Sequence, residues 1–192
     1  MRATVCNFAN TLGYLLEEAS RLPGNVRLAF VLYRWAARRG DAFAQANLAR
    51  LYHEGKGVAR RRDAAMHWFG KAAEQGHSWA QNMLACAYLE RDLPGKALYW
   101  YEKAASESGY APAQFNLGWM YEEGIGTDVL PSEARKYYLQ AARELPEAQY
   151  NLALMYFDGR GGPRNEKVAR EWLQKAAASG LEQARELLSG LR

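Results

Sequence analysis

The sequence predicts an all-α solenoid, in which helix pairs stack one after another. Three observations predict it: a ladder of one helical phrase, a glycine-rich stop after most copies, and a second helix rich in alanine and aromatic residues. A fixed period near 35 residues is typical of tandem units that each pack only on their neighbours. The ladder begins at Ala44, Ala80, Ala113, Ala148 and Ala184, in steps of 36, 33, 35 and 36 residues.

The composition limits the classes of protein to which this chain can belong. The 192 residues are 49% hydrophobic and 24% charged, with a net charge of +4, and no apolar run approaches the roughly 20 residues of a membrane-spanning helix. The start lacks the apolar stretch of about 7–15 residues of a secretory signal, so we expect a cytoplasmic protein. Cys6 and Cys86 lie in different repeats, and no disulfide framework is indicated.

The first complete copy, residues 41–77, shows the unit. Helix A carries Ala44, Leu48 and Tyr52 at helical spacing, and Gly55-Lys56-Gly57 ends it with residues that tolerate left-handed backbone angles. Asp63 is expected to cap helix B. Helix B carries Ala65, Trp68, Phe69, Ala72 and Ala73, and Gly76 ends it.

The other copies follow the same template. Residues 111–145 match at an offset of 69, with Ser132 as the expected cap, and residues 146–180 match at an offset of 104. Residues 78–110 have lost four residues between their helices, which predicts a tighter turn. A degenerate copy at 6–40 and a capping helix at 181–192 complete a single domain of about eleven helices, spanning 1–192.

The repeated residues resemble the Sel1-like repeat, a relative of the tetratricopeptide repeat. The resemblance is carried most completely by Ala113–Tyr121 with Gly124 and Gly126, and by Trp100–Ala105. It implies a right-handed superhelix of antiparallel helix pairs with A helices on the concave face, a role as adaptor, scaffold, regulator or inhibitor, and no enzymatic activity.

If A helices line a groove, the residues opposite their Ala and Leu positions point into it. Aromatic anchors beside amides there suit a peptide, a helix or a protein partner. For the aromatics, the alternative is sideways packing on the next A helix; for the asparagines, it is hydrogen bonding to a neighbouring helix. The predicted partner-binding residues are Phe43, Asn47, Arg50, Trp79, Asn82, Phe115, Asn116, Trp119, Tyr150, Asn151, Leu154 and Phe157.

Catalytic and metal sites have little support in the sequence. His53, His67 and His77 show no i, i+4 pair and are interpreted as surface residues, and the Gly-x-Gly loops lack the features of a phosphate cradle. No continuous basic stripe favours nucleic acid. We therefore expect a monomeric binder of a protein or peptide, with no cofactor, no metal, no nucleic acid and no membrane insertion. The alternatives are an exported binder of a cell-envelope or small-molecule ligand, and a self-associating structural protein.

Overall fold

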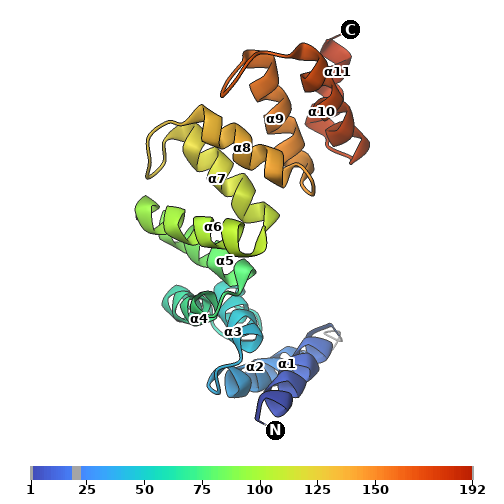
Figure 1. The fold of residues 1–192 in the computed structure, drawn as a ribbon. Coiled ribbons are helices and arrows are strands. Elements are labelled where there is room, and N and C mark those ends of the chain that lie inside the picture. The colour runs from blue at the N-terminus through green and yellow to red at the C-terminus, as the bar shows by residue number, and fades with distance from the viewer. Residues whose placement is uncertain (1, 19–22, 192) are drawn as a thin grey trace. The chain divides into compact units, whose positions relative to one another are not determined.

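The computed structural model describes residues 2–18 and 23–191, with side chains for 8–18 and 24–191. These residues form eleven helices and no strand (Figure 1), as the sequence predicts. The helices are α1 (Arg2–Glu18), α2 (Pro23–Ala37), α3 (Ala42–Glu54), α4 (Arg62–Glu74), α5 (Ser78–Leu89), α6 (Pro94–Ser108), α7 (Ala111–Glu123), α8 (Pro131–Ala141), α9 (Pro146–Asp158), α10 (Glu166–Ala178) and α11 (Glu182–Gly190).

The chain divides into two compact units, residues 1–87 and 88–192, which are described separately. In the first unit α1 packs on α2, α2 on α3, and α3 on α4. In the second, the same chain of contacts runs from α6 to α11. Each helix therefore buries its apolar stripe mainly against its neighbours in the sequence, which is the packing of a repeat array.

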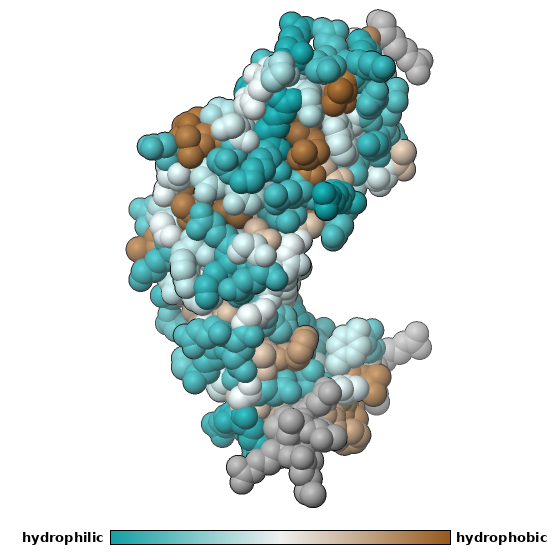
Figure 2. Space-filling model, in the orientation of Figure 1, coloured by the Kyte–Doolittle hydropathy of each residue, from teal (hydrophilic) through white to brown (hydrophobic). Residues whose placement is uncertain are grey.

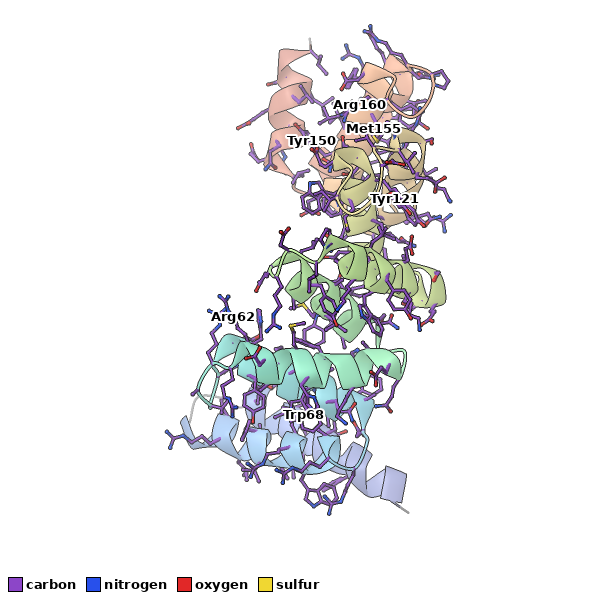
Figure 3. All side chains as sticks on the ribbon, turned by 90° about the vertical axis from the view of Figure 1, so that its left-hand side faces the viewer. Arg62, Trp68, Tyr121, Tyr150, Met155 and Arg160 are labelled. Atoms are coloured by element: carbon purple, nitrogen blue, oxygen red, sulfur yellow. The ribbon has the colours of Figure 1, made fainter. Side chains whose placement is uncertain are left out.

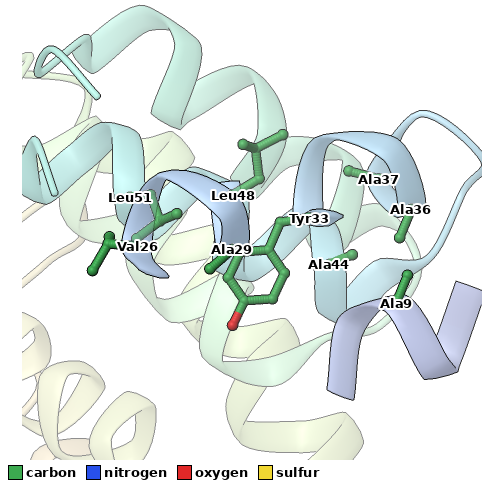
Figure 4. Packing of buried hydrophobic residues seen from close by; sticks show 9 residues of the cluster. All are labelled: Ala9, Val26, Ala29, Tyr33, Ala36, Ala37, Ala44, Leu48 and Leu51. Carbon is green, nitrogen blue, oxygen red and sulfur yellow. The ribbon is translucent and has the colours of Figure 1, made fainter. Parts of the chain in front are cut away.

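The repeated alanines and leucines of the ladder form the cores. In the first unit Ala29, Tyr33, Leu48 and Leu51 are completely buried (Figure 4). In the second unit Ala148 and Leu152 of α9 are packed with Tyr138 of α8 and are also completely buried. Small residues let the helices approach closely, while the aromatic rings fill the space between them.

The glutamine of the ladder ties α3, α5 and α9 to the end of the preceding B helix. The side-chain amide of Gln45 donates to the carbonyl of Ala37 at 3.1 Å, and that of Gln149 donates to Ala142 at 2.8 Å. Arg185, which replaces the glutamine in the last copy, donates to Ala177 at 3.3 Å. The amide thus satisfies a carbonyl that a helix C-terminus leaves without an intrahelical partner.

The two glycines of each Gly-x-Gly loop have different roles. Gly159 has φ 70° and ends α9, with its N–H bonded to Met155. Gly161 has φ 71°, and a Cβ atom there would lie 2.1 Å from the carbonyl oxygen of Pro131, at the start of the preceding B helix. The second glycine is therefore required both by its backbone angle and by close contact with the neighbouring repeat.

Helix B begins two residues earlier than the sequence predicts, so the expected caps are wrong. Asp63 lies inside the first turn of α4, which starts at Arg62, and Ser132 lies inside α8, which starts at Pro131. The residue before each helix instead donates its N–H to the carbonyl of a tyrosine in helix A: Arg61 to Tyr52 at 2.9 Å, Leu130 to Tyr121 at 2.8 Å and Asn165 to Tyr156 at 2.8 Å. Of these three, only Asn165 also caps its helix with its side chain.

The turn between α5 and α6 is shorter than the three Gly-x-Gly loops that join helix A to helix B, as predicted. It comprises residues 90–93, whereas residues 124–130 separate α7 from α8. Asp92 takes the left-handed angle, with φ 57°, that glycine takes in the longer loops. Cys86 is partly buried, whereas the side chain of Cys6 lies outside the described residues.

Candidate functional site

In the first unit the predicted A-helix residues include an aromatic group. Phe43, at the start of α3, is 64% exposed and meets the ring of His77 edge-on at 4.9 Å between centroids. His77 lies 6.2 Å from Trp79, which in turn packs edge-on against Phe69 at 5.4 Å. The structure therefore brings Phe43 and Trp79 together through a histidine.

The three histidines, interpreted from the sequence as surface residues, differ in exposure: His53 and His77 are partly buried, and His67 is exposed. His77 is partly buried, and its Nδ1 accepts a hydrogen bond from the backbone N–H of Ala80 at the start of α5. Burial lowers the pKa of His77. His53 is also partly buried, beside Phe69, while His67 is exposed.

Arg50, predicted to contact a ligand, is held by carboxylates of the protein. Its guanidinium lies 2.5 Å from Glu17 of α1 and 3.2 Å from Glu54. Lys56, at the middle of the first Gly-x-Gly loop, lies 3.1 Å from the same Glu17, and the Tyr33 hydroxyl donates to it at 3.3 Å. Burial acts to raise the pKa of Glu17, but hydrogen bonds from Arg50 and Lys56 outweigh it and hold that pKa below its ordinary value.

The second unit repeats this arrangement. Glu122 of α7 accepts a hydrogen bond from the Tyr138 hydroxyl at 2.7 Å and forms an ion pair with Arg160, at the middle of the last Gly-x-Gly loop. Glu122 and Tyr138 lie 105 positions after Glu17 and Tyr33. We call these clusters the two carboxylate locks. Sequence reasoning missed them, although the shared repeat position of the two glutamates was a usable signal.

Two of the predicted asparagines, Asn47 and Asn151, form hydrogen bonds inside their own unit. Asn47 donates to the side chain of Asn10 at 3.0 Å. Asn82 is 7% exposed, and Asn151 is hydrogen-bonded to the hydroxyl of Tyr138. Asn116 is partly buried. The amides of Asn47 and Asn151 thus link neighbouring repeats, and the role of all four asparagines in gripping a ligand stays a prediction.

The aromatic residues of the second unit differ in exposure. Phe115 packs against the α8–α9 core, with its ring 5.6 Å from that of Tyr138, while Tyr150 (Figure 3) and Phe157 pack with Leu173 and the last helix. Leu154 is partly buried. Trp119 is 40% exposed on α7 and is the most accessible of the aromatic residues predicted in this unit.

A separate polar groove of about 540 Å³ lies among α6, α7 and α8, and contains none of the predicted residues. It is lined by Ala105, Ser106, Gly109, Gln114, Lys136, Tyr137, Gln140, Arg143 and Glu144. Among the described residues, no three His, Cys, Asp or Glu side chains are grouped so that they could hold a metal ion. No described helix is long and apolar enough to cross a bilayer.

The Sel1 repeat model matches residues 9–41, 42–77, 80–108, 111–144 and 146–181. The chain belongs to the Sel1 repeat family. A Sel1 repeat protein from Oxalobacter formigenes has a similar structure, with a TM-score of 0.87 and 32% identity, over 97% of this chain and 76% of that one. A protective antigen of uropathogenic Escherichia coli with the same fold gives a TM-score of 0.89 and 31% identity, over 97% of this chain and 42% of the antigen.

Curated Sel1-repeat relatives include proteins named as regulators. Chitin synthase regulatory factor 3 of Schizosaccharomyces pombe is 38% identical over 128 residues, which is 62% of this chain and 14% of that protein. The exopolysaccharide production negative regulator of Rhizobium meliloti is 30% identical over 154 residues, 77% of this chain and 48% of the regulator. The chain thus spans less than half the length of either relative.

Proposed function

We propose that this Sel1-repeat chain is a protein-binding module that regulates or assembles its partner and has no catalytic activity of its own. Membership of the family and the names of its regulatory relatives support this role. The packing also supports this role, because the repeated residues are buried between neighbouring helices and hold them together. Many of the residues between them differ from repeat to repeat, as positions that specify a partner would.

The observation that carries the proposal is Trp119, a large aromatic residue left 40% exposed on α7. Tryptophan is enriched among the residues that dominate binding energy at protein interfaces, because it buries a large area while ordering few rotatable bonds. Phe115 lies one helical turn before Trp119 on the same face of α7. We infer that this face takes an extended peptide or a helix, with Trp119 as its anchor.

The carboxylate locks refine which predicted residues take part. Arg50 and Asn47 are already engaged with Glu17 and Asn10, so a ligand would have to break those contacts to use them. Freeing Arg50 would leave the buried Glu17 with one cation fewer, which is costly. The proposed site therefore depends on aromatic contacts in the second unit more than on charged or amide side chains in the first.

The proposal is tested by photo-crosslinking from two positions of the second unit. A benzophenone amino acid at position 119 should capture a discrete protein from native lysate, whereas the same group at Tyr99, which is 50% exposed on α6, should not. Trp119→Ala should weaken binding of the captured partner about tenfold or more, as expected for a residue that contributes 1.4 kcal/mol or more.

Tyr99→Ala is the matched control, because it removes an exposed aromatic ring from helix B of the same unit. It should leave affinity unchanged, and circular dichroism should show native helix content for both variants. A partner that binds the folded Trp119→Ala variant as tightly as the parent would rule out this face of α7 as the site.

A further inference from the structure

The polar groove among α6, α7 and α8 contains a buried glutamine that lacks the contact made by its counterparts. Gln114 of α7 is 8% exposed and lines the groove. Among the described residues, none forms a hydrogen bond with its side chain. The glutamines at the same ladder position in α3, α5 and α9 all donate to the end of the preceding B helix. An unpaired buried amide is costly, so an occupant of the groove that pairs with Gln114 gains stability.

A longer end of α6 explains the missing bond. Three further residues of α6 follow Ala105, whereas one further residue of α4 follows Ala73. The carbonyl of Ala105 accepts the backbone N–H of Gly109 at 3.1 Å. Gln114 lies one position further from this carbonyl along the chain than its counterparts in α3 and α5 do from theirs. At Gly109 the atom nearest to an added Cβ would be Nε2 of Gln114, at 4.0 Å, so the glycine leaves this amide open to the groove.

The side-chain oxygen of Gln114 lacks a donor for a second reason. In the first unit Oε1 of Gln45 accepts a hydrogen bond from Nε2 of Gln75 at 2.7 Å. Gln114 occupies the position of Gln45 at an offset of 69. At the same offset Glu144 occupies the position of Gln75, and its carboxylate has no N–H to donate. Gln114 therefore presents an unpaired N–H and an unpaired oxygen to the groove.

The partners of Gln45 show which chemical group fits Gln114. Gln45 donates to a backbone carbonyl, that of Ala37, and accepts from an amide N–H. The backbone of a bound peptide offers both groups. In an extended segment the N–H and C=O of one residue point to the same side, so one side-chain amide can bond both. The groove, at about 540 Å³, has the size of a site for a short segment of this kind.

The charged residues of the groove favour a segment with an acidic side chain. Two of the charged lining residues, Lys136 and Arg143, are cations, and one, Glu144, is acidic. Lys136 is paired with Glu133 at 2.8 Å, whereas no carboxylate of the described residues forms an ion pair with the exposed Arg143. The visible surface over α6 and α8 is mainly hydrophilic (Figure 2). An acidic side chain can therefore pair with Arg143 without displacing a contact.

We propose that this groove binds an extended, acidic peptide segment of a protein partner. The N–H and C=O of one peptide residue bond to Gln114, and an acidic side chain pairs with Arg143. Trp119 does not belong to this site, because it lies five positions after Gln114, about 140° further round α7. The inference shares with the proposed function the class of partner and does not depend on the face that carries Trp119.

The test is an NMR titration of the isotope-labelled 192-residue chain with acetyl-Gly-Glu-Gly-amide, which has peptide groups and one carboxylate. The side-chain amide signals of Gln114, identified by their loss in Gln114→Leu, should shift and saturate at millimolar peptide. Those of Gln149, which already donates to Ala142 at 2.8 Å, should not shift and are the internal control. Gln114→Leu should weaken binding about tenfold, because two hydrogen bonds to the peptide are lost.

The contribution of charge is measured with a neutral peptide and two arginine variants. Acetyl-Gly-Gln-Gly-amide should bind about threefold more weakly than the acidic peptide, as expected for one exposed ion pair. Arg143→Gln should remove this difference. Arg164→Gln, at an arginine that is 65% exposed and paired with Glu166 in the same unit, is the matched control and should preserve it. Circular dichroism should show native helix content for every variant.

An absence of saturable shifts at Gln114, or equal binding by the folded Gln114→Leu variant, would overturn the proposal. Succinate, a carboxylate without a peptide group, should leave the Gln114 signals in place. Equal shifts with succinate would assign the groove to small anions and would also overturn the proposal. None of these results bears on crosslinking from position 119, so failure of this site and failure of the proposed function are distinguishable.

Discussion

At Gly118 the backbone of α7 lies against the ring of Tyr138. A Cβ atom there would be 2.6 Å from the Tyr138 Cδ1 atom, and one at Gly13 would be 2.7 Å from Cε1 of Tyr33, the equivalent tyrosine. Each tyrosine donates a hydrogen bond to a glutamate that lies one helical turn after the glycine in helix A. Because the glycine has no side chain, the tyrosine ring can reach this glutamate. Burial and these hydrogen bonds raise the pKa of both tyrosines, which keeps them in the donor form.

Gly118→Ala should therefore destabilise the second unit by about 1–3 kcal/mol, the usual cost of overpacking, in spite of the better helix propensity of alanine. Gly70→Ala is the matched control, because Gly70 lies in α4 with nothing within 4 Å of the added carbon, and it should stabilise by about 0.5–1 kcal/mol. Urea unfolding measures both. Equal effects of the two substitutions would contradict the close contact with Tyr138.

Glu17 makes stability of the first unit depend on pH. Its pKa is lowered in the folded state, so its contribution is present above the unfolded value near 4.5 and is lost as pH falls through the folded value. At pH 7 we expect Glu17→Gln to cost about 1–3 kcal/mol, less than a fully buried pair, because Arg50 and Lys56 remain partly hydrated.

The difference in unfolding free energy between Glu17→Gln and the parent should shrink as pH falls below about 4.5, because the parent then also carries a neutral side chain. Lys136→Gln, which removes the exposed ion pair with Glu133, should cost far less at pH 7. A Glu17→Gln penalty that stays constant from pH 7 to pH 3 would show that the charge of Glu17 does not contribute.

Among the helices, the start of each B helix is fixed by the loop before it and not by a side-chain cap. Arg61 and Asn165 have nearly the same extended backbone, at φ −143° and −151°, and both donate to a tyrosine carbonyl, yet only Asn165 caps its helix. We therefore expect Asn165→Ala to destabilise by about 1 kcal/mol and Arg61→Asn to stabilise by about 0.5–1 kcal/mol.

Thermal unfolding monitored by circular dichroism measures these changes, and Asp63→Ala provides the control. Asp63 lies within the first turn of α4 and not at its N-cap, so its removal should cost less than the loss of the Asn165 cap. A loss near 1 kcal/mol for Asp63→Ala, with no gain from Arg61→Asn, would mean that the helix starts at the later residue.

The sequence predicts the helices correctly, but it does not predict the residues that precede α4 and α8. The repeat period specifies the helices, their stops and the short turn after α5, because buried alanines, leucines and glycines recur at fixed spacing. It also predicts which residues share the A-helix face. It does not predict what those residues meet, and Arg50 shows why: its partner Glu17 belongs to a degenerate copy, 33 positions away. Trp119, by contrast, is 40% exposed.

Across the whole molecule, stability should be local, because helices pack mainly on their neighbours in the chain. The terminal helix α11 is the clearest test. It buries Ala184 completely against Leu173 and Ala176 and packs Leu187 and Leu188 onto the same core, while Arg170 donates to the carbonyl of Leu191 at 3.2 Å. A chain that ends at Gly180 would expose this core to water.

We expect that truncation to lower the midpoint of thermal unfolding and to reduce amide-exchange protection in α9 and α10, with little change in α3 and α4. The stability of a repeat array is approximately a sum of contacts between neighbouring repeats. Loss of packing at one end should therefore weaken the adjoining helix pair first. Leu188→Ala, which removes part of one contact, should give a smaller loss in the same helices. Equal loss of protection in α3 and α10 would mean that the whole chain unfolds as one cooperative body, and the repeats would then not act as near-independent units.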